Sequence, residues 1–285
     1  MIFMTVEELK KKYSSIERIK RGGQKTVFKA KCKDGHTVAL KIIPNTNDAR
    51  VIQEIELVKD ILIENVPVIY DHGIVHDDSI GEDVLYIVEE YIEGQSLRDY
   101  LKEGKKLTLT EAFLLLNTLL EIEMQLEDRM ILHRDINPNN IILGETGRIY
   151  LIDFGLAKNM NGQSLTRTTA AHGPFTPGYA PYEQFANMKI VQDVRTDLFQ
   201  IGVTIYESCT GGNPFVKPNE TPYQIMSRTL TMIPNPLVIP GDTKGMFAEL
   251  VNMLMAKNQS QRPESAKTAM RYLMAIKPTL LLKED

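Results

Sequence analysis

The chain has 285 residues, of which 25% are charged and 43% hydrophobic, and a formal net charge of -4. This length suffices for one large domain or two lobes with a sizeable core, and the composition is that of an ordinary globular protein. The weak negative charge excludes a general attraction to nucleic acid or to an anionic membrane surface, and no apolar run approaches the roughly 20 residues of a membrane-spanning helix, so we expect a cytoplasmic protein that binds neither.

The first part of the chain is predicted to consist mainly of strands. It opens with the capping-box sequence Thr5-Val6-Glu7-Glu8, which predicts a short helix ending near Lys12. Alternating or continuous apolar residues bounded by turn residues predict strands at residues 15–20, 26–30, 36–43 and 84–88. Between the last two strands a helix is predicted from Asn47 onward, with one apolar face formed by Val51, Ile55, Val58 and Leu62.

Beyond Glu93-Gly94-Gln95 the chain becomes mainly helical. The predicted elements of this part are helices at residues 110–126, 246–255 and 266–275 and apolar strands at residues 141–143 and 149–152. Strands first and helices second, joined near a glycine, indicate an α+β fold with two unlike lobes and a cleft between them. We place the lobes at residues 1–92 and 93–285.

Two short polar motifs carry the chemistry. His133-Arg134-Asp135 is followed by Asn140, and Asp153-Phe154-Gly155 comes directly after an apolar strand. An acid on a loop can orient an attacking hydroxyl, while amide and carboxylate oxygens are ligands for the metal ions that neutralise nucleotide phosphates. The two motifs in this order therefore indicate phosphoryl transfer.

The spacing of these motifs is similar to the H-R-D-x-x-x-x-N and D-F-G motifs of eukaryotic-type protein kinases, and resembles in particular the stand-alone microbial serine/threonine kinases. The resemblance covers nearly the whole chain. It implies one protein kinase domain over residues 1–285 with the bilobal kinase fold, ATP and Mg²⁺ as cofactors, and proteins as substrates. It also implies Asp135 as the catalytic base or orienting carboxylate, and Asn140 and Asp153 as the Mg²⁺ ligands.

The resemblance assigns further residues to the nucleotide. Val38-Ala39-Leu40-Lys41 is similar to the V-A-I-K strand of the family, which makes Lys41 the cation on the α- and β-phosphates. Glu54 best matches the acid that pairs with this lysine, and Glu56 is the alternative. The other nucleotide-binding residues implied are Gly22, Gly23, Val27, Ala39, Ser96 and the backbone from Glu90 to Ile92.

Three positions match structural residues of the family. Glu183, in Ala180-Pro181-Tyr182-Glu183, resembles the acid of the A-P-E element and is expected to pair with Arg262. That ion pair would tie the activation segment to the large lobe. Asp197 matches a buried acid that holds the backbone of the catalytic loop in the family. None of the three is expected to take part in the chemistry.

The activation segment indicates a preference for serine and threonine. Thr176 stands where serine/threonine kinases carry a threonine whose hydroxyl bonds the catalytic acid. Upstream of it lie hydroxyl residues beside Arg167, and a phosphate on one of them could bind Arg134 and order the loop. The candidate phosphorylation sites are Thr166, Thr168 and Thr169. A merely polar, hydroxyl-rich loop is the alternative for each of them.

Two departures from the family pattern concern positive charge near the phosphates. The glycine-rich loop keeps only Gly22 of its three usual glycines, with Lys20 and Lys25 at the other two positions. Asn137 replaces the lysine that normally follows the catalytic acid, and it can bond Asp135 or Thr176 without bringing a charge. Losing a cation there costs on the order of a hundredfold in rate. We hypothesise that Lys25 or Lys20 supplies the missing charge, and we keep Asn137 among the catalytic residues.

A third departure is Glu89, which stands just before the hinge acid where the family usually has an apolar residue or threonine. A buried carboxylate there needs a partner or a raised pKa. The sequence leaves open whether Glu89 is buried or lies in water at the edge of a pocket.

The two cysteines indicate neither a disulfide bond nor a metal site. Cys32 and Cys209 lie far apart, with no CxxC sequence and no neighbouring histidine pattern. We therefore predict neither a disulfide nor a zinc site, and a reducing compartment.

Two other functions compete with a serine/threonine kinase. A pseudokinase, which binds nucleotide as a scaffold without transferring phosphate, is favoured by Asn137 and the reduced glycine loop. A small-molecule kinase of related fold is the third possibility, although Arg134, the Ala-Pro-x-Glu element and Arg262 favour a protein substrate. The oligomeric state and the target proteins stay open.

Overall fold

The computed structural model describes residues 4–21, 25–44, 59, 62–153, 158–159, 175–186, 188 and 191–283, with the backbone alone for residues 20, 21, 158 and 159. These residues form two compact units. The first unit comprises Met1–Leu62 and Val66–Glu93, and the second comprises Ile63–Asn65 and Gly94–Asp285. Each unit has its own core and is described by itself below.

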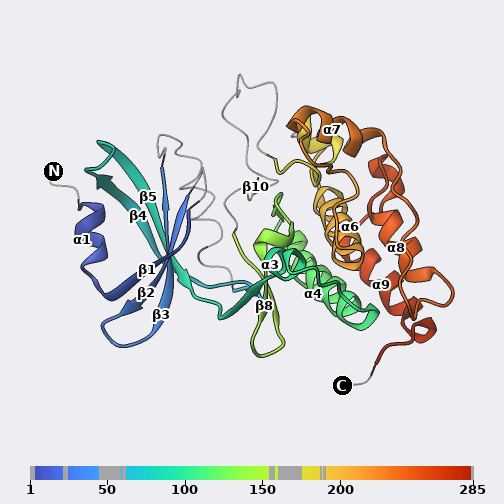
Figure 1. Ribbon diagram of the computed structural model, residues 1–285, viewed down its shortest axis with the longest axis horizontal. Coiled ribbons are helices and arrows are strands. Elements are labelled where there is room, and N and C mark those ends of the chain that lie inside the picture. The colour runs from blue at the N-terminus through green and yellow to red at the C-terminus, as the bar shows by residue number, and fades with distance from the viewer. Residues whose placement is uncertain are drawn as a thin grey trace. The chain divides into compact units, whose positions relative to one another are not determined.

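The first unit is built on a five-stranded antiparallel sheet with the strand order β1-β2-β3-β5-β4. Its elements are α1 (Val6–Lys10), β1 (Tyr13–Arg21), β2 (Thr26–Cys32), β3 (Thr37–Ile43), β4 (Ile69–Asp77) and β5 (Glu82–Glu90). Helix α1 begins at the predicted capping box, in which Thr5 and Glu8 bond each other's backbone N–H. Figure 1 shows α1 beside β4 and β5, where the N–H of His76 donates to the carbonyl of Met4 at 3.0 Å.

The two faces of this sheet differ in what they bury. Alternate residues of a strand point to opposite faces. One face packs with α1 into the main core of the unit, formed by Val6, Leu9, Ala30, Val38, Leu40, Ile42, Val75, Val84, Tyr86 and Val88. The other face carries a smaller apolar cluster around Leu85 and Ile87. Lys41 lies on this second face, because it directly opposes Ile87 in the register of β3 and β5.

The predicted strands of the first unit are present, but the prediction missed β4. Its sequence begins Ile69-Tyr70-Asp71-His72-Gly73, in which charged residues and a glycine interrupt the apolar pattern. Most of this edge strand is accordingly not buried, and Val75 is its deepest residue. The helix predicted from Asn47 lies almost wholly outside the described residues. Leu62, placed on its apolar face, is described and is 72% exposed, so that placement is wrong.

The second unit is mainly helical. Its helices are α3 (Leu97–Lys102), α4 (Leu109–Asp128), α5 (Tyr182–Phe185), α6 (Val194–Thr210), α7 (Pro222–Thr231), α8 (Met246–Leu254) and α9 (Ala266–Ile276). Its short strands are β6 (Gly94–Ser96), β7 (Ile131–Leu132), β8 (Ile141–Gly144), β9 (Ile149–Leu151) and β10 (Lys158–Asn159). The long helix and the two apolar strands predicted here are confirmed as α4, β8 and β9. Figure 1 shows α4, α6, α8 and α9 packed side by side.

Helix α6 is the centre of this unit and is buried along nearly its whole length. Its polar residues Asp197, Gln200 and Thr204 are buried with the apolar ones. Gly202 allows α8 to approach closely, since a Cβ at this position would lie 2.8 Å from Cβ of Leu254. Buried polar groups need hydrogen-bond partners, and Asp197, Gln200 and Thr204 find them in the loop that carries His133, Arg134 and Ile136.

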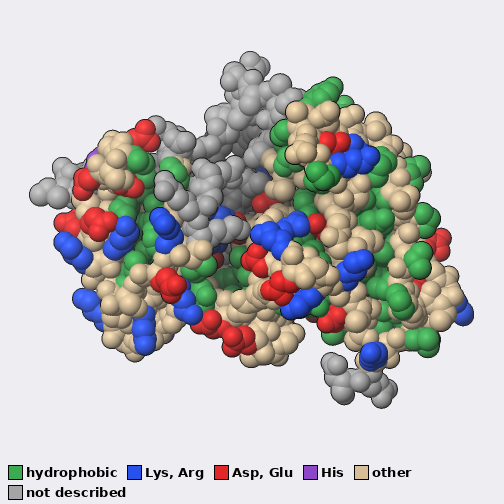
Figure 2. Space-filling model, in the orientation of Figure 1, with side chains coloured by type: hydrophobic (Ala, Val, Ile, Leu, Met, Phe, Trp, Pro, Cys, Tyr) green, Lys and Arg blue, Asp and Glu red, His purple; other side chains and the backbone are tan. Residues whose placement is uncertain are grey.

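Among the described residues on the face drawn in Figure 2, basic and acidic side chains are interspersed and form no extended region of one charge sign. Of the helices that the structure describes, none combines the length and the apolar composition needed to cross a lipid bilayer.

Gly94 is predicted to be irreplaceable at the start of β6. Its φ is +154°, and a Cβ there would lie 2.8 Å from Cα of Gly144 and would also strike the carbonyl oxygen of Leu143. We expect Gly94→Ala to lower the free energy of unfolding by about 2–4 kcal/mol, through backbone strain and overpacking. Chemical denaturation measures the loss. The control Gly212→Ala meets no atom within 4 Å, and an equal loss in both variants would contradict the steric reason.

Candidate active site

The carboxylate of Asp135 is held by three side-chain donors. It lies on the loop between β7 and the short helical turn η1 (Pro138–Asn140). Nδ2 of Asn137 donates to Oδ1 of Asp135 at 3.0 Å, and Nδ2 of Asn140 donates to Oδ2 at 2.8 Å. The hydroxyl of Thr176 donates to Oδ1 at 2.5 Å, as the sequence predicted. Asp135, Asn137 and Asn140, three residues singled out from sequence, are thus brought together.

The backbone of the same loop is held from α6 by Asp197. This carboxylate is fully buried and accepts the N–H of His133 at 2.8 Å and the N–H of Arg134 at 2.7 Å. The role predicted for Asp197 is therefore confirmed in the geometry. Arg134 has a φ of +66°, a left-handed conformation that is costly for a residue with a side chain. The two hydrogen bonds to Asp197 stabilise this bend.

Two glutamines that the sequence analysis gave no role complete the support of the loop. Oε1 of Gln200 accepts the N–H of Ile136 at 2.7 Å, and Nε2 of Gln200 donates to the carbonyl of Arg134 at 2.9 Å. Gln184 donates to the same carbonyl at 2.8 Å. Gln200 lies one turn beyond Asp197 on α6, and that spacing was the available sign that both side chains face one loop.

The donor set of Asn140 and Asp153 fits a magnesium ion. Asn140 uses its Nδ2 toward Asp135, which leaves its amide oxygen as a ligand. Asp153 follows β9, is half-buried and has a φ of +77°. The N–H of Ile152 donates to the carbonyl of Asn140 at 2.8 Å, so the two candidate ligands are anchored to each other through the backbone. Carboxylate and amide oxygens are hard ligands of the kind that Mg²⁺ prefers.

Three candidate nucleotide-binding residues of the first unit, Val27, Ala39 and Lys41, share one face of its sheet. Val27 directly opposes Lys41 across β2 and β3, and Ala39 is two residues from Lys41 on β3. Ala39 opposes Glu89 across β3 and β5. Nζ of Lys41 lies 2.6 Å from Oε1 of Glu89, and both side chains are buried. The open question about Glu89 is therefore answered: the carboxylate is buried and paired with Lys41.

The positions of the remaining candidate residues give little further support for nucleotide binding. Glu90 ends β5, and its N–H already donates to the carbonyl of Val68 at 2.8 Å. Ile92 is half-buried in the segment that follows. The hydroxyl of Ser96 accepts the N–H of Asp99 at 3.0 Å as the cap of α3, so its role near a ribose stays a prediction. Gly22, Gly23, Glu54, Glu56, Thr166, Thr168 and Thr169 lie outside the described residues.

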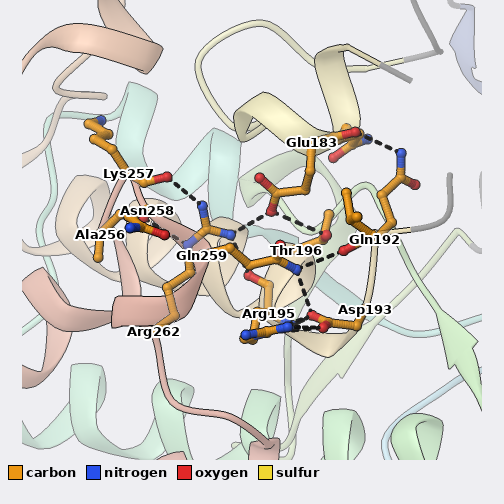
Figure 3. Close-up of polar contacts among 12 residues, drawn as sticks. Glu183, Gln192, Asp193, Arg195, Thr196, Ala256, Lys257, Asn258, Gln259 and Arg262 are labelled. Atoms are coloured by element: carbon orange, nitrogen blue, oxygen red, sulfur yellow. Dashed lines mark hydrogen bonds and ion pairs between the residues drawn. The ribbon is translucent and has the colours of Figure 1, made fainter. Parts of the chain in front are cut away.

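A buried ion pair fixes the segment that follows Thr176. Nη1 of Arg262 lies 2.6 Å from Oε1 of Glu183 and also donates to the carbonyl of Arg195 at 2.8 Å. The hydroxyl of Thr196 donates to the same carboxylate, and Nε2 of Gln192 donates to the carbonyl of Glu183. Figure 3 shows these groups converging on Glu183. The predicted pairing of Glu183 with Arg262 is confirmed.

A second polar cluster in this region was not predicted. Nη1 of Arg98, on α3, lies 2.6 Å from Oε1 of Glu207, on α6, and Nη2 of Arg98 donates to the hydroxyl of Tyr179 at 2.6 Å. The hydroxyl of Tyr179 also donates to Glu207. The cluster joins the segment after Thr176 to two helices. Its members are far apart in sequence, and Arg98 and Glu207 belong to no motif, so only the tertiary structure reveals the cluster.

Glu123 is an unusual feature of the core beneath the loop. It is fully buried on α4, and neither of its carboxylate oxygens has a hydrogen-bond partner among the described residues. Burial raises the pKa of Glu123 well above its usual value, and the charges of Asp197 and Glu127 raise it further. Burial also raises the pKa of Asp197, to about 7. Both oxygens of Asp197 accept backbone N–H groups, which stabilise its charged form. Of these two buried carboxyl groups, Glu123 is therefore the one that keeps a proton.

The turn between β2 and β3 corrects one expectation about the cysteines. Cys32 does have a neighbouring histidine, since Cys32, Asp34 and His36 bring one ligand atom each within 4.8 Å of one another. Asp34 and His36 are exposed and already pair with each other at 2.5 Å. Burial and the charge of Asp34 raise the pKa of the Cys32 thiol, which therefore keeps its proton. These features do not favour a metal site there.

Comparison with known proteins places this geometry in a family context. A sequence model described as protein kinase domain matches residues 13–273. A probable serine/threonine-protein kinase of Clostridium perfringens is 28% identical over 276 residues, which cover 93% of this chain and 38% of the relative. The probable serine/threonine-protein kinase PknB of Bifidobacterium longum is 32% identical over 268 residues, 90% of this chain and 38% of the relative. The serine/threonine-protein kinase ULK1 of Homo sapiens is 26% identical over 266 residues, which cover 88% of this chain and 24% of the relative. This chain thus spans well under half the length of these relatives.

Replacing Glu123 is expected to stabilise the protein in a pH-dependent way. In the folded state the carboxyl of Glu123 keeps its proton at pH values where the unfolded chain has already released it. The folded state is therefore destabilised as the pH rises from the usual pKa of a glutamate through the raised pKa of Glu123. We expect the stability of Glu123→Gln relative to wild type to increase from pH 5 to pH 8. Urea denaturation at both pH values measures it. Glu121→Gln, on the exposed side of α4, is the control, and a gain independent of pH would refute the assignment.

Removing one partner of the Glu183–Arg262 pair is expected to destabilise the fold strongly. Glu183→Gln leaves the Arg262 guanidinium buried without its counter-charge, which costs about 3–5 kcal/mol. The matched control is Glu7→Gln, which breaks an exposed pair with Lys10 and costs about 1 kcal/mol at most. Thermal and urea unfolding of both variants measure the difference. Equal losses would show that burial of the first pair is not decisive.

Proposed function

The chain belongs to the protein kinase domain family, and on that basis we propose that it is an ATP-dependent serine/threonine protein kinase. The observation that carries the proposal is the carboxylate of Asp135, which Asn137, Asn140 and Thr176 hold in one orientation. In the proposed reaction a protein hydroxyl oxygen attacks the γ-phosphorus of ATP. The bond from this phosphorus to the β–γ bridging oxygen breaks, ADP leaves, and Asp135 accepts the proton of the hydroxyl.

Positioning is the main contribution of these residues. Phosphoryl transfer leaves little covalent work to the protein, so rate depends on alignment and on charge near the phosphates. Asp197, Gln200 and Gln184 fix the loop that carries Asp135, and this rigidity supports a catalytic role for the loop. When bound, Mg²⁺ would be held by Asn140 and Asp153 and would neutralise charge on the phosphates.

The proposed preference for serine and threonine rests on Thr176. Its hydroxyl bond to Asp135 at 2.5 Å is the contact expected for this class. The relatives whose names give a specificity are serine/threonine kinases. Autophosphorylation at Thr166, Thr168 or Thr169 is part of the proposal, and mass spectrometry after incubation with Mg-ATP tests it.

The hydrogen bonds of Asn137 weigh against the competing scaffold function, although the residue is uncharged. Its amide bonds Asp135 twice, at 3.0 Å to the backbone carbonyl and 3.0 Å to the carboxylate, and so holds the catalytic acid in place. The presence of Lys41, Asp135, Asn140 and Asp153 together also weighs against a scaffold without transfer. The charge that Asn137 does not supply remains assigned to Lys25 or Lys20, as a hypothesis.

The two compact units are proposed to be the two lobes, predicted as residues 1–92 and 93–285. The change of unit at Glu93 and Gly94 supports this division. The cytoplasm is the proposed location, since both cysteines are free thiols and ATP is available there. Proteins with serine or threonine hydroxyls are the proposed substrates.

Substitution of Asp135 tests the proposed function. We expect Asp135→Asn to lower phosphoryl transfer about 100-fold or more, because the amide cannot accept the hydroxyl proton, while the melting temperature changes little. Transfer from radiolabelled ATP to dephosphorylated casein and to the chain itself measures the rate. Asp128→Asn, at the exposed end of α4, should keep wild-type activity. A wild-type chain that binds ATP but transfers no phosphate would establish the scaffold function instead.

A further inference from the structure

The pairing of Lys41 with Glu89 is set by the register of the sheet. Lys41 opposes Ile87 and Ala39 opposes Glu89 across β3 and β5, so Lys41 and Glu89 are diagonal neighbours on one face. Diagonal neighbours in an antiparallel pair are within reach of long side chains. Nζ of Lys41 and Oε1 of Glu89 are 2.6 Å apart. The contact therefore needs no other element to bring its partners together.

Both charges of this pair are removed from water. Lys41 is 4% exposed and Glu89 is 8% exposed, and their strand neighbours Leu85 and Ile87 form an apolar cluster. A buried charge without a counter-charge is costly, so the carboxylate strongly favours one position of the ammonium group. A lysine ammonium has three N–H donors, and the bond to Glu89 leaves donors for other acceptors.

We propose that Glu89 is a positioning residue that fixes the ammonium of Lys41 for the phosphates of the nucleotide. The inference rests on the proposed kinase function, because it gives Glu89 a part in the same reaction. Glu89 acts through Lys41 and does not touch the reacting atoms. Since the register of β3 and β5 sets the contact, the sheet itself orients the lysine, in addition to the pairing predicted with Glu54.

The proposal predicts a loss of rate that is separable from a loss of stability. Glu89→Gln keeps the shape of the side chain and removes its charge, and Glu89→Asp keeps the charge on a shorter arm. We expect Glu89→Gln to lower kcat about tenfold, because the misplaced ammonium stabilises the transition state less, and Glu89→Asp to recover part of the loss. KM for Mg-ATP and the melting temperature should change much less. Glu82→Gln, on an exposed position of the same strand, is the control.

A second measurement does not depend on activity. In the absence of nucleotide, trace acetylation of the intact protein with limiting acetic anhydride, read by mass spectrometry, reports how well each lysine amine is protected. Lys102 is an exposed reference. We expect Lys41 to react at least about fivefold faster in Glu89→Gln than in wild type, because the variant lacks the buried counter-charge that Glu89 supplies to the ammonium.

The outcomes separate this inference from the proposed function. An active wild type whose kcat stays within twofold in Glu89→Gln, with unchanged labelling of Lys41, overturns the positioning role and leaves the kinase function intact. Parallel loss of kcat and melting temperature in both variants, without recovery in Glu89→Asp, reduces Glu89 to a structural residue and also overturns it. A wild type that transfers no phosphate refutes the proposed function, and labelling of Lys41 that still depends on Glu89 then leaves only a structural ion pair.

Discussion

The candidate site depends on one buried charge, the carboxylate of Asp197. A buried carboxylate in the first turn of α6 is tolerated only if hydrogen-bond donors reach it, and its donors are the backbone N–H groups of His133 and Arg134. These two hydrogen bonds stabilise the left-handed conformation of Arg134. Asp135 follows directly, so its position is a consequence of satisfying the charge beneath it. The site is thus built from the core outward.

The sequence predicted much of the fold because its local signals agree with the tertiary structure. The capping box at Thr5, the alternation of β2 and β3, and the long apolar face of α4 each have a local physical cause. The prediction failed at β4, where the strand lies at a sheet edge and keeps polar residues in water. No local signal indicated that Glu123 is buried. From sequence alone, an acid in the middle of the apolar face of a helix cannot be distinguished from an acid at the edge of that face.

For the site, motif spacing succeeded where the partners lie within or beside a motif. The bonds from Thr176 to Asp135, from the catalytic loop to Asp197 and from Arg262 to Glu183 are all of this kind. It could not predict contacts that depend on strand register or helix packing. Glu89 was noticed only as an exception, and its pairing with Lys41 follows from the alignment of two strands.

The cluster of Arg98, Tyr179 and Glu207 has a consequence for how the chain can change over evolutionary time. A half-buried guanidinium, a buried phenol and a buried carboxylate from three separate elements hydrogen-bond one another. Loss of Arg98 leaves the buried polar groups of Tyr179 and Glu207 without one of their partners. Substitutions at Arg98, Tyr179 and Glu207 are therefore coupled: a homologous protein that loses one of the three residues is expected to replace the other two as well.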